Sequence, residues 1–341
     1  MVTFIIVYSV PLLPDMPIKS LDTIRPVIGN ELDEFEVRFR GAMKSSVPLL
    51  DKITYYLIKR RGKQLRPMLV FFSAGLNGKI NDSTYRAAAL IELLHNATLV
   101  HDDVVDDTYQ RRGAFSINAL WKNKVAVLVG DYMLSRGLLL AVHDKEFQLL
   151  ELVSTAVQKM SEGELLQIEK TRKLNINEEE YFEIIANKTA SLVAACCASG
   201  TASTGASEET VKRMWQMGEM LGIAFQIKDD LLDYGTGQDI GKPTGTDIKE
   251  KKMSLPLIYA LEQSTYIEKK NIISKLKNKS SDKATATTIF DFVKEKKGLE
   301  YAQSKMYEYR EKSKIMLNEL PDSSYKTAFS QLIEFVTERD R

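Results

Sequence analysis

The chain has 341 residues, and its 47 basic and 46 acidic side chains leave a formal net charge of +1 at pH 7. This balance excludes a general nucleic-acid-binding protein, which needs a dominant basic surface, so any anion site must be local. The two cysteines, Cys196 and Cys197, are adjacent in an alanine-rich stretch. They indicate close helix packing rather than a metal site or a disulfide, and they fit a protein of the reducing cytoplasm.

The sequence predicts a single all-α domain over residues 24–341. Glycine (18) and proline (9) are scarce, and no linker rich in Pro, Gly or Ser divides the chain. Apolar residues recur at helical spacing from Ile24 onward, most clearly over residues 85–100 and 126–140, which indicates about ten to thirteen helices. Turns are predicted at residues 77–78, 112–113, 175–177, 205 and 235–245.

Two stretches depart from this pattern. Residues 1–23 form an N-terminal extension that we expect to be disordered. Its apolar start lacks the basic region of a signal peptide and is too short to span a bilayer, so no transmembrane segment is expected there. Residues 268–283 are polar and rich in Lys and Ser, which predicts a mobile surface connection between helices.

Two copies of one acidic pattern, DDxxD, lie in otherwise apolar helices at residues 102–106 and 229–233. At about 100° per residue, the first, second and fifth positions fall within roughly 100° of the helix circumference, so three carboxylates project from one side. Buried among Val and Leu, these charges would be costly without a cation. Carboxylates with little Cys or His nearby suit Mg²⁺ that also contacts phosphate. The prediction is a clamp around one diphosphate, formed by Asp102, Asp103, Asp106, Asp229, Asp230 and Asp233.

A single DDxxD could equally be a solvated helix face. Two copies, each embedded in apolar sequence and followed by basic residues, favour the metal-binding interpretation. An EF-hand is excluded because its loop needs acidic residues at alternate positions and a central glycine.

Basic residues lie where a diphosphate between the acidic helices would need them. In GKQLRP, Gly62 supplies a turn, and Lys63 and Arg66 stand three residues apart before a proline that can begin a helix. Arg111 and Arg112 directly follow the first cluster, where guanidinium groups can make bidentate phosphate contacts. Each further candidate would alone be an ordinary solvated or core residue, and only their joint position near the clusters favours a binding role; they are Lys188, Thr189, Gln226, Lys242, Lys252 and His95.

Taken in order, these strings resemble the trans-isoprenyl diphosphate synthases of the polyprenyl synthetase family. The resemblance spans residues 24–341 and is carried by GKQLRP (62–67), HNATLVHDDVVDD (95–107), QRRG (110–113), GDYM (130–133), GELLQ (163–167), KT (188–189), FQIKDDLLD (225–233) and GKPTGTDIKEKKMSLP (241–256). It implies a helical bundle around a deep central tunnel and a homodimer. The implied activity is a Mg²⁺-dependent, head-to-tail condensation of isopentenyl diphosphate with an allylic diphosphate.

Matched motif by motif, the resemblance implies that the six aspartates hold three Mg²⁺ ions on the allylic diphosphate, directly or through water. The same group would be bound by Arg111, Lys188, Lys242 and Lys252, with Lys252 preferred to Lys251 for its spacing from Asp247. The isopentenyl diphosphate site would consist of Gly62, Lys63, Arg66, His95 and Arg112. Thr189 and Gln226 would face the developing cation. No strong protein base is obvious near the motifs, so the departing diphosphate is the expected proton acceptor.

The residues before the first cluster predict a medium or long product. Ala97 and Thr98 stand where synthases of short products in this family usually carry an aromatic. The tunnel should therefore continue toward Leu94 and Ile91, one and two helical turns lower. The C-terminal sequence also resembles that of quinone side-chain synthases, which indicates products of roughly six to nine isoprene units at about one unit per 5.4 Å turn.

Three alternatives stay open at this point. A farnesyl or geranylgeranyl diphosphate synthase would share every motif. A class I terpene cyclase would bind one diphosphate and would typically carry N/D-x-x-S/T-x-x-x-E in place of the second DDxxD, which here reads DDLLD. A non-catalytic subunit of a heteromeric synthase would be expected to have eroded aspartates, whereas both clusters are intact.

Overall fold

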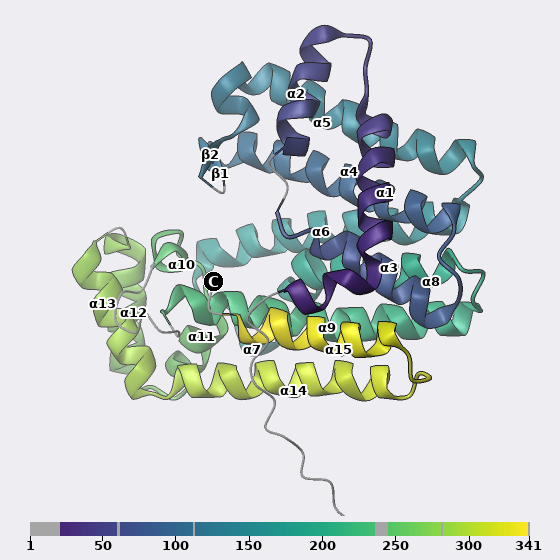
Figure 1. Cartoon of the computed structure of the whole chain (residues 1–341). Helices are drawn as coiled ribbons and strands as arrows, with labels where there is room; N and C mark the ends of the chain where they lie inside the picture. The colour runs from purple at the N-terminus through teal and green to yellow at the C-terminus, as the bar shows by residue number, and fades with distance from the viewer. Residues whose placement is uncertain (1–20, 60–61, 112, 236–244, 281, 340–341) are drawn as a thin grey trace, which may run out of the picture.

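The computed structural model describes residues 21–59, 62–111, 113–235, 245–280 and 282–339, and these form a bundle of α-helices (Figure 1). The all-α prediction is confirmed. After two 3₁₀ turns, Leu21–Thr23 and Arg25–Ile28, the helices are α1 (Gly29–Met43), α2 (Pro48–Lys59), α3 (Leu65–Asn77), α4 (Asp82–Val105), α5 (Ile117–His143), α6 (Phe147–Lys173), α7 (Glu178–Ile185), α8 (Ser191–Ala202), α9 (Glu208–Asp233), α10 (Thr246–Lys249), α11 (Leu255–Glu262), α12 (Tyr266–Lys279), α13 (Lys283–Glu295), α14 (Gly298–Asn318) and α15 (Ser324–Glu338).

The number of described helices exceeds the ten to thirteen expected from periodicity for two local reasons. The helix α10 has only four residues, too few to show a period. A π-turn over Ala186–Ala190 separates α7 from α8, although the rod continues through it. The short antiparallel pair β1 (Gln110–Arg111) and β2 (Ala114–Phe115) forms the predicted turn after the first acidic cluster.

The centre of the bundle is built on close helix contact. Of the twelve residues of α8, all but Val193 are buried, among them Cys196 and Cys197, which are free thiols as predicted. Helix α9 packs against α8 and against the π-turn before it at two glycines. A Cβ on Gly218 would lie 2.8 Å from the Cα of Ala194, and one on Gly222 would lie 2.5 Å from the Cα of Ala190. The small side chains therefore set the depth at which α9, and the second acidic cluster at its end, meets the rest of the fold.

The ends of the two acidic helices lie on the same side of the molecule. In Figure 1, the β1–β2 pair that follows α4 and the short α10 that follows α9 are both at the left end of the bundle. The turns expected at residues 77–78, 175–177 and 205 also end or separate helices, as predicted. Of the turn expected at residues 235–245, residues 236–244 lie outside the described residues.

The prediction of a mobile connection over residues 268–283 is wrong. Residues 266–279 form helix α12. Its side chains are mostly polar, but Ile272 and Leu276, one helical turn apart, are buried against the core. At its start, Thr265 and Glu268 cap each other's backbone N–H groups. The high Lys and Ser content of the segment led to the wrong prediction, because it outweighed the narrow apolar stripe and the capping box that indicate a helix.

Helix α5 leaves an apolar face uncovered. The side chains of Val127, Leu128, Leu139 and Val142 are 40–59% exposed. Within the part of the chain that the structure describes, α5 is also the one helix whose length and hydropathy would allow it to cross a membrane, with a third of its most apolar window buried. A single helix of this kind is weak evidence for a membrane span, since helices of soluble proteins pass the same test.

Candidate active site

The first acidic cluster lies at the C-terminal end of α4. Asp102 and Asp106 are exposed, whereas Asp103 is 5% exposed. The amide of Asn118 at the start of α5 donates to the backbone oxygen of Asp103 at 2.9 Å, which ties the two helices together beside the cluster. The C-terminal end of a helix already carries partial negative charge. The carboxylates of Asp102, Asp103 and Asp106 add to this charge, so this end of α4 is strongly negative.

Asp230 of the second cluster is held by neutral donors on both oxygens. It is 7% exposed, and it accepts hydrogen bonds from the Tyr181 hydroxyl at 2.7 Å and from the Gln226 amide at 3.0 Å. The Thr189 hydroxyl donates in turn to the Gln226 oxygen at 2.8 Å. Two polar residues proposed to face the cation are thus hydrogen-bonded to each other and, through Gln226, to an aspartate of the cluster.

The two other aspartates of this cluster have different partners. Asp229 forms an ion pair with Arg339, the residue that follows α15. Asp233 accepts hydrogen bonds from the backbone N–H groups of Thr246 and Asp247, both at 3.1 Å, and so caps α10. The carboxylates therefore connect α9 to the C-terminus and to the segment that carries Asp247.

A cavity of about 160 Å³ brings several predicted residues together. Lys188 donates to the side-chain oxygen of Gln167 at 3.1 Å and pairs with Glu164 at 2.5 Å. Lys252 lies 3.6 Å from Asp247. The amine of Lys251 instead donates to the backbone oxygen of Lys277, which supports the choice of Lys252. The polar residues that line the cavity are Gln167, Tyr181, Lys188, Thr189, Gln226, Asp230, Asp247, Lys252 and Ser254.

The π-turn over Ala186–Ala190 explains how Lys188 and Thr189 reach this cavity. The N–H of Ser191 bonds to the oxygen of Ala186, five residues back, so the helix holds one extra residue in this turn. Helix α6 approaches the turn so closely that a Cβ on Gly163 would lie 2.7 Å from the backbone nitrogen of Lys188. A π-turn of this kind is often found at functional sites.

Two carboxyls in this cavity have raised pKa values in the metal-free protein. Burial raises the pKa of Asp230 to about 6, against the hydrogen bonds from Gln226 and Tyr181. Burial also raises the pKa of Asp247 to about 7, and the nearby Asp230 contributes to the shift. Both groups therefore take up protons on folding near neutral pH when no cation is bound.

In EDTA, we expect the free energy of unfolding to fall by at least about 1 kcal/mol between pH 5 and pH 8. The pKa values of Asp230 and Asp247 lie above their ordinary value of 3.8, so the folded chain binds more protons than the unfolded chain, and this contribution is lost as the pH rises. Urea denaturation at several pH values measures the slope, and Asp247→Asn should flatten it. A stability that rose over this range would contradict the assignment.

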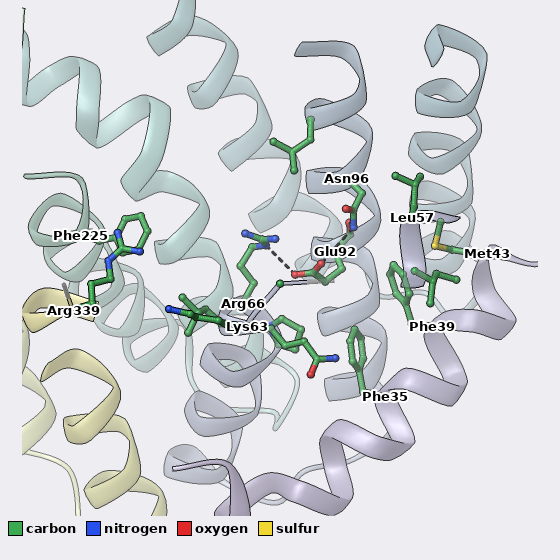
Figure 2. Close-up of a pocket in the computed structure, with 16 residues that line it drawn as sticks. Phe35, Phe39, Met43, Leu57, Lys63, Arg66, Glu92, Asn96, Phe225 and Arg339 are labelled. Atoms are coloured by element: carbon green, nitrogen blue, oxygen red, sulfur yellow. Dashed lines mark hydrogen bonds and ion pairs between the residues drawn. The ribbon is translucent and has the colours of Figure 1, made fainter. Parts of the chain in front are cut away.

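A second, larger cavity of about 410 Å³ lies beside the predicted GKQLRP turn (Figure 2). Gly62, Lys63 and Arg66 all line it. Arg66 donates to Glu92 at 2.9 Å, and the Lys63 amine lies 5.0 Å from the centre of the Phe335 ring. The turn is shaped by the residue between them: Gln64 has a left-handed backbone with φ of 57°, and its side chain accepts a hydrogen bond from Arg25. Such a backbone is unfavourable for a non-glycine residue, and it is often found at functional sites.

This cavity also joins the two acidic helices. Asn96 and Leu99 line it from α4, one to two turns before the first cluster, and Phe225 lines it from α9, one turn before Asp229. Its wall is completed by apolar side chains of α1 and α2 and by Arg339. Both clusters thus begin next to one cavity that carries the predicted basic residues.

Other predicted residues lie elsewhere. His95 is half-buried in α4 and is not among the residues that line either cavity. Arg111 lies in β1. Arg112 and Lys242 lie outside the described residues.

The four residues proposed to set product length also line neither cavity. Ile91, Leu94 and Ala97 are at most 2% exposed, and a Cβ on Gly137 of α5 would lie 3.5 Å from Leu94. The Thr98 hydroxyl, one turn from the cluster, donates to a backbone oxygen of its own helix.

Sequence reasoning missed four residues with direct contacts to the site, namely Tyr181, Asp247, Glu92 and Arg339. Tyr181 precedes the KT motif by two helical turns, a spacing that could have signalled it. In the sequence analysis Asp247 was used only to choose Lys252 over Lys251 by spacing, and it was not itself predicted as a site residue. No local pattern indicates that Arg339 reaches Asp229, because the contact spans 110 residues.

The chain is similar to known proteins of one family. The family model described as Polyprenyl synthetase matches residues 47–293. The octaprenyl diphosphate synthase of Escherichia coli K12 is 32% identical over 94% of this chain and 100% of its own. A polyprenyl synthase of Caulobacter crescentus, solved with calcium and isoprenyl diphosphate, has a TM-score of 0.85 at 31% identity, covering 95% of this chain and 99% of its own. The geranylgeranyl pyrophosphate synthase structure of Bacteroides thetaiotaomicron has a TM-score of 0.79 at 36% identity, over 94% and 99%.

Proposed function

We propose that the two aspartate clusters hold an allylic diphosphate through Mg²⁺. The premise is that the chain belongs to the polyprenyl synthetase family and is a trans-prenyl diphosphate synthase. The observation that supports this most directly is the joining of both cluster-bearing helices at one cavity with Lys63 and Arg66. The test is incubation of the purified protein with labelled isopentenyl diphosphate and several allylic primers, followed by chromatography of the dephosphorylated products. Absence of incorporation with every primer would overturn the proposal.

The chemistry of the clusters fits Mg²⁺. All their side-chain donors are carboxylate oxygens, the ligands this ion prefers. Among residues that the structure describes, no three carboxylate, imidazole or thiol groups are close enough to form a metal site by themselves. Mg²⁺ commonly takes one or two carboxylates and completes its shell with water and phosphate, so the substrate would supply the remaining ligands. The Caulobacter relative was solved with a divalent cation and a diphosphate together.

Within this proposal, the smaller cavity stabilises the reacting end of the allylic substrate. When bound, the metal ions favour departure of the diphosphate by neutralising its growing charge. Lys188 and Lys252 add positive charge on the same side. Thr189 and Gln226, held by their mutual hydrogen bond, would place their oxygen dipoles near the positive carbon. The departing diphosphate accepts the final proton.

The larger cavity is proposed to bind isopentenyl diphosphate through Lys63 and Arg66. Arg66 is kept in place by Glu92, whose side chain is 11% exposed. Phosphate oxygens can accept charge-assisted hydrogen bonds from the remaining donors of the guanidinium and from the lysine amine. His95 and Arg112 remain proposed members of this site.

We expect Lys63→Ala to raise the KM for isopentenyl diphosphate about tenfold and to change the KM for the primer by less than about twofold, because one charge-assisted phosphate contact is lost. Arg66→Ala should have the same kinetic effect. It should also lower the free energy of unfolding by about 2 kcal/mol, since Glu92 loses its partner.

Steady-state kinetics with each substrate varied, together with urea denaturation, tests both expectations. The double variant Arg66→Ala/Glu92→Gln is the control, because it should recover stability and leave KM high. Equal effects on both KM values would reject the division of basic residues between two sites.

We also propose a homodimer that meets at α5. The exposed side chains of Val127, Leu128, Leu139 and Val142 form an apolar face that a second copy of the helix could cover. On this interpretation the hydropathy of α5 reflects a subunit contact in a cytoplasmic enzyme.

We also propose a medium or long product, for a quinone side chain. The relatives do not decide the product length, because those of similar identity include both an octaprenyl and a geranylgeranyl synthase.

A further inference from the structure

Arg339 links the second acidic cluster to the larger cavity. It directly follows the last turn of α15, pairs with Asp229, and lines the larger cavity together with Lys63 and Arg66. Its guanidinium carbon lies 4.4 Å from the centre of the Phe225 ring, so the group is stacked on α9 (Figure 2). Its side chain is 15% exposed. A guanidinium that is buried to this extent requires anionic partners to offset the loss of its hydration.

The pairing of this guanidinium is incomplete. Its Nε is buried and has no hydrogen-bond partner among the described residues, although another of its nitrogens donates to Asp229. A buried donor without a partner is unfavourable. The Arg339 side chain as a whole lines the larger cavity, where an anion can bind beside it. The second anion is therefore expected to come from a bound molecule.

The position of Asp229 supplies the other half of the argument. A divalent cation bound at this carboxylate would approach a guanidinium that already uses one of its oxygens, and two positive groups would repel each other at this distance. The ion pair with Arg339 already neutralises this carboxylate. A metal ion bound at Asp229 would therefore compete with Arg339 for this carboxylate.

We propose that Arg339 serves two anions in turn: it is the counter-ion of Asp229 before metal binds, and a ligand of the diphosphate of isopentenyl diphosphate afterwards. This rests on the proposed function. Lys63 and Arg66 already bring positive charge to the cavity that would receive the diphosphate, and Arg339 stands in its wall. Loading of metal at the second cluster thereby prepares the site of the other substrate.

The proposal requires that removal of Arg339 change two affinities in opposite directions. Arg339→Gln should bind Mn²⁺, titrated without substrate and followed by electron paramagnetic resonance, about tenfold more tightly than the wild type. The same variant should bind isopentenyl diphosphate, measured by calorimetry at saturating Mg²⁺ without primer, about tenfold more weakly. Arg339→Lys should lie between the two. If Arg339→Gln weakened both, or left both unchanged, the proposal would be overturned.

Two controls separate this role from a loosened C-terminus and from failure of the proposed function. Glu338→Gln breaks the neighbouring ion pair with Arg310 at the same end of α15, and it should alter neither affinity. In Asp229→Asn, adding Arg339→Gln should no longer tighten Mn²⁺ binding. If the wild type bound no isopentenyl diphosphate, the proposed function and the diphosphate role would both be rejected, while the Mn²⁺ measurements would still decide whether Arg339 competes for Asp229.

Discussion

Asp102→Ala and Asp229→Ala are each expected to lower kcat about a thousandfold or more, because each removes a carboxylate that holds metal where charge develops in the transition state. The clusters stand at the C-terminal ends of α4 and α9, where the helix ends themselves add negative charge that favours a bound cation. Initial rates at saturating substrates, with Mg²⁺ varied, measure the effect. Near-normal turnover in either variant, or full activity in EDTA, would contradict the metal assignment.

We expect these two variants to lose kcat to a similar extent but to differ in stability. Asp102 is exposed, so its loss should change the melting temperature little. Asp229 is the partner of a guanidinium that is 15% exposed, so its loss leaves a buried positive charge and should lower the melting temperature by several degrees for a chain of this size. Thermal unfolding of both variants therefore checks that a loss of kcat in Asp102→Ala is not a loss of fold.

Ala97→Phe is expected to shorten the product to about three to five isoprene units while incorporation of isopentenyl diphosphate is largely retained. Ala97 is 2% exposed and precedes the first cluster by about one turn and a half of α4, with the buried Leu94 and Ile91 below it. A ring at this point would close a channel that ran down the helix, and it would leave the metal-binding end unchanged. Chromatography of the products from one primer gives the length distribution.

A graded series makes this expectation sharper. Ala97→Leu should give products of intermediate length, because the stop is steric. If no channel passes Ala97, the phenylalanine would instead overpack the contact between helices and lower the melting temperature without a change in product. A wild type that made only geranylgeranyl diphosphate would also show that the floor of the channel lies elsewhere.

Local sequence patterns were sufficient for the helical class, the main turns and the two acidic helices. The helix α4 could be predicted because its stretch of helically spaced apolar residues is long. The turn after it could be predicted because glycine readily adopts the positive φ that Gly113 has there. Residues 268–283 were mistaken for a connection because the two buried side chains of α12, Ile272 and Leu276, are too few to outweigh its lysines in an argument from composition. A capping box would have been the better guide.

The partners of the aspartates could not be predicted in the same way. Tyr181 reaches Asp230 across 49 residues, and Arg339 reaches Asp229 across 110. Such contacts depend on how α7 and α15 pack against α9, which is decided by shape and small residues such as Gly222. A DDxxD string indicates what its carboxylates can bind. It does not indicate which protein groups hold them in the absence of the ligand.

Because of the π-turn between α7 and α8, the number of residues in this continuous helical segment decides which way its active-site side chains point. Its extra residue shifts the rotational phase of one half of the rod against the other, so Tyr181 on one side and the buried face of α8 on the other can both be in register with α9. One residue more or fewer would turn Lys188 and Thr189 by about 100° around the axis. Substitutions at the exposed positions of α7, Glu179 and Glu183, are therefore compatible with the active site, whereas a single insertion or deletion between the Asn177 cap and Ala190 is not.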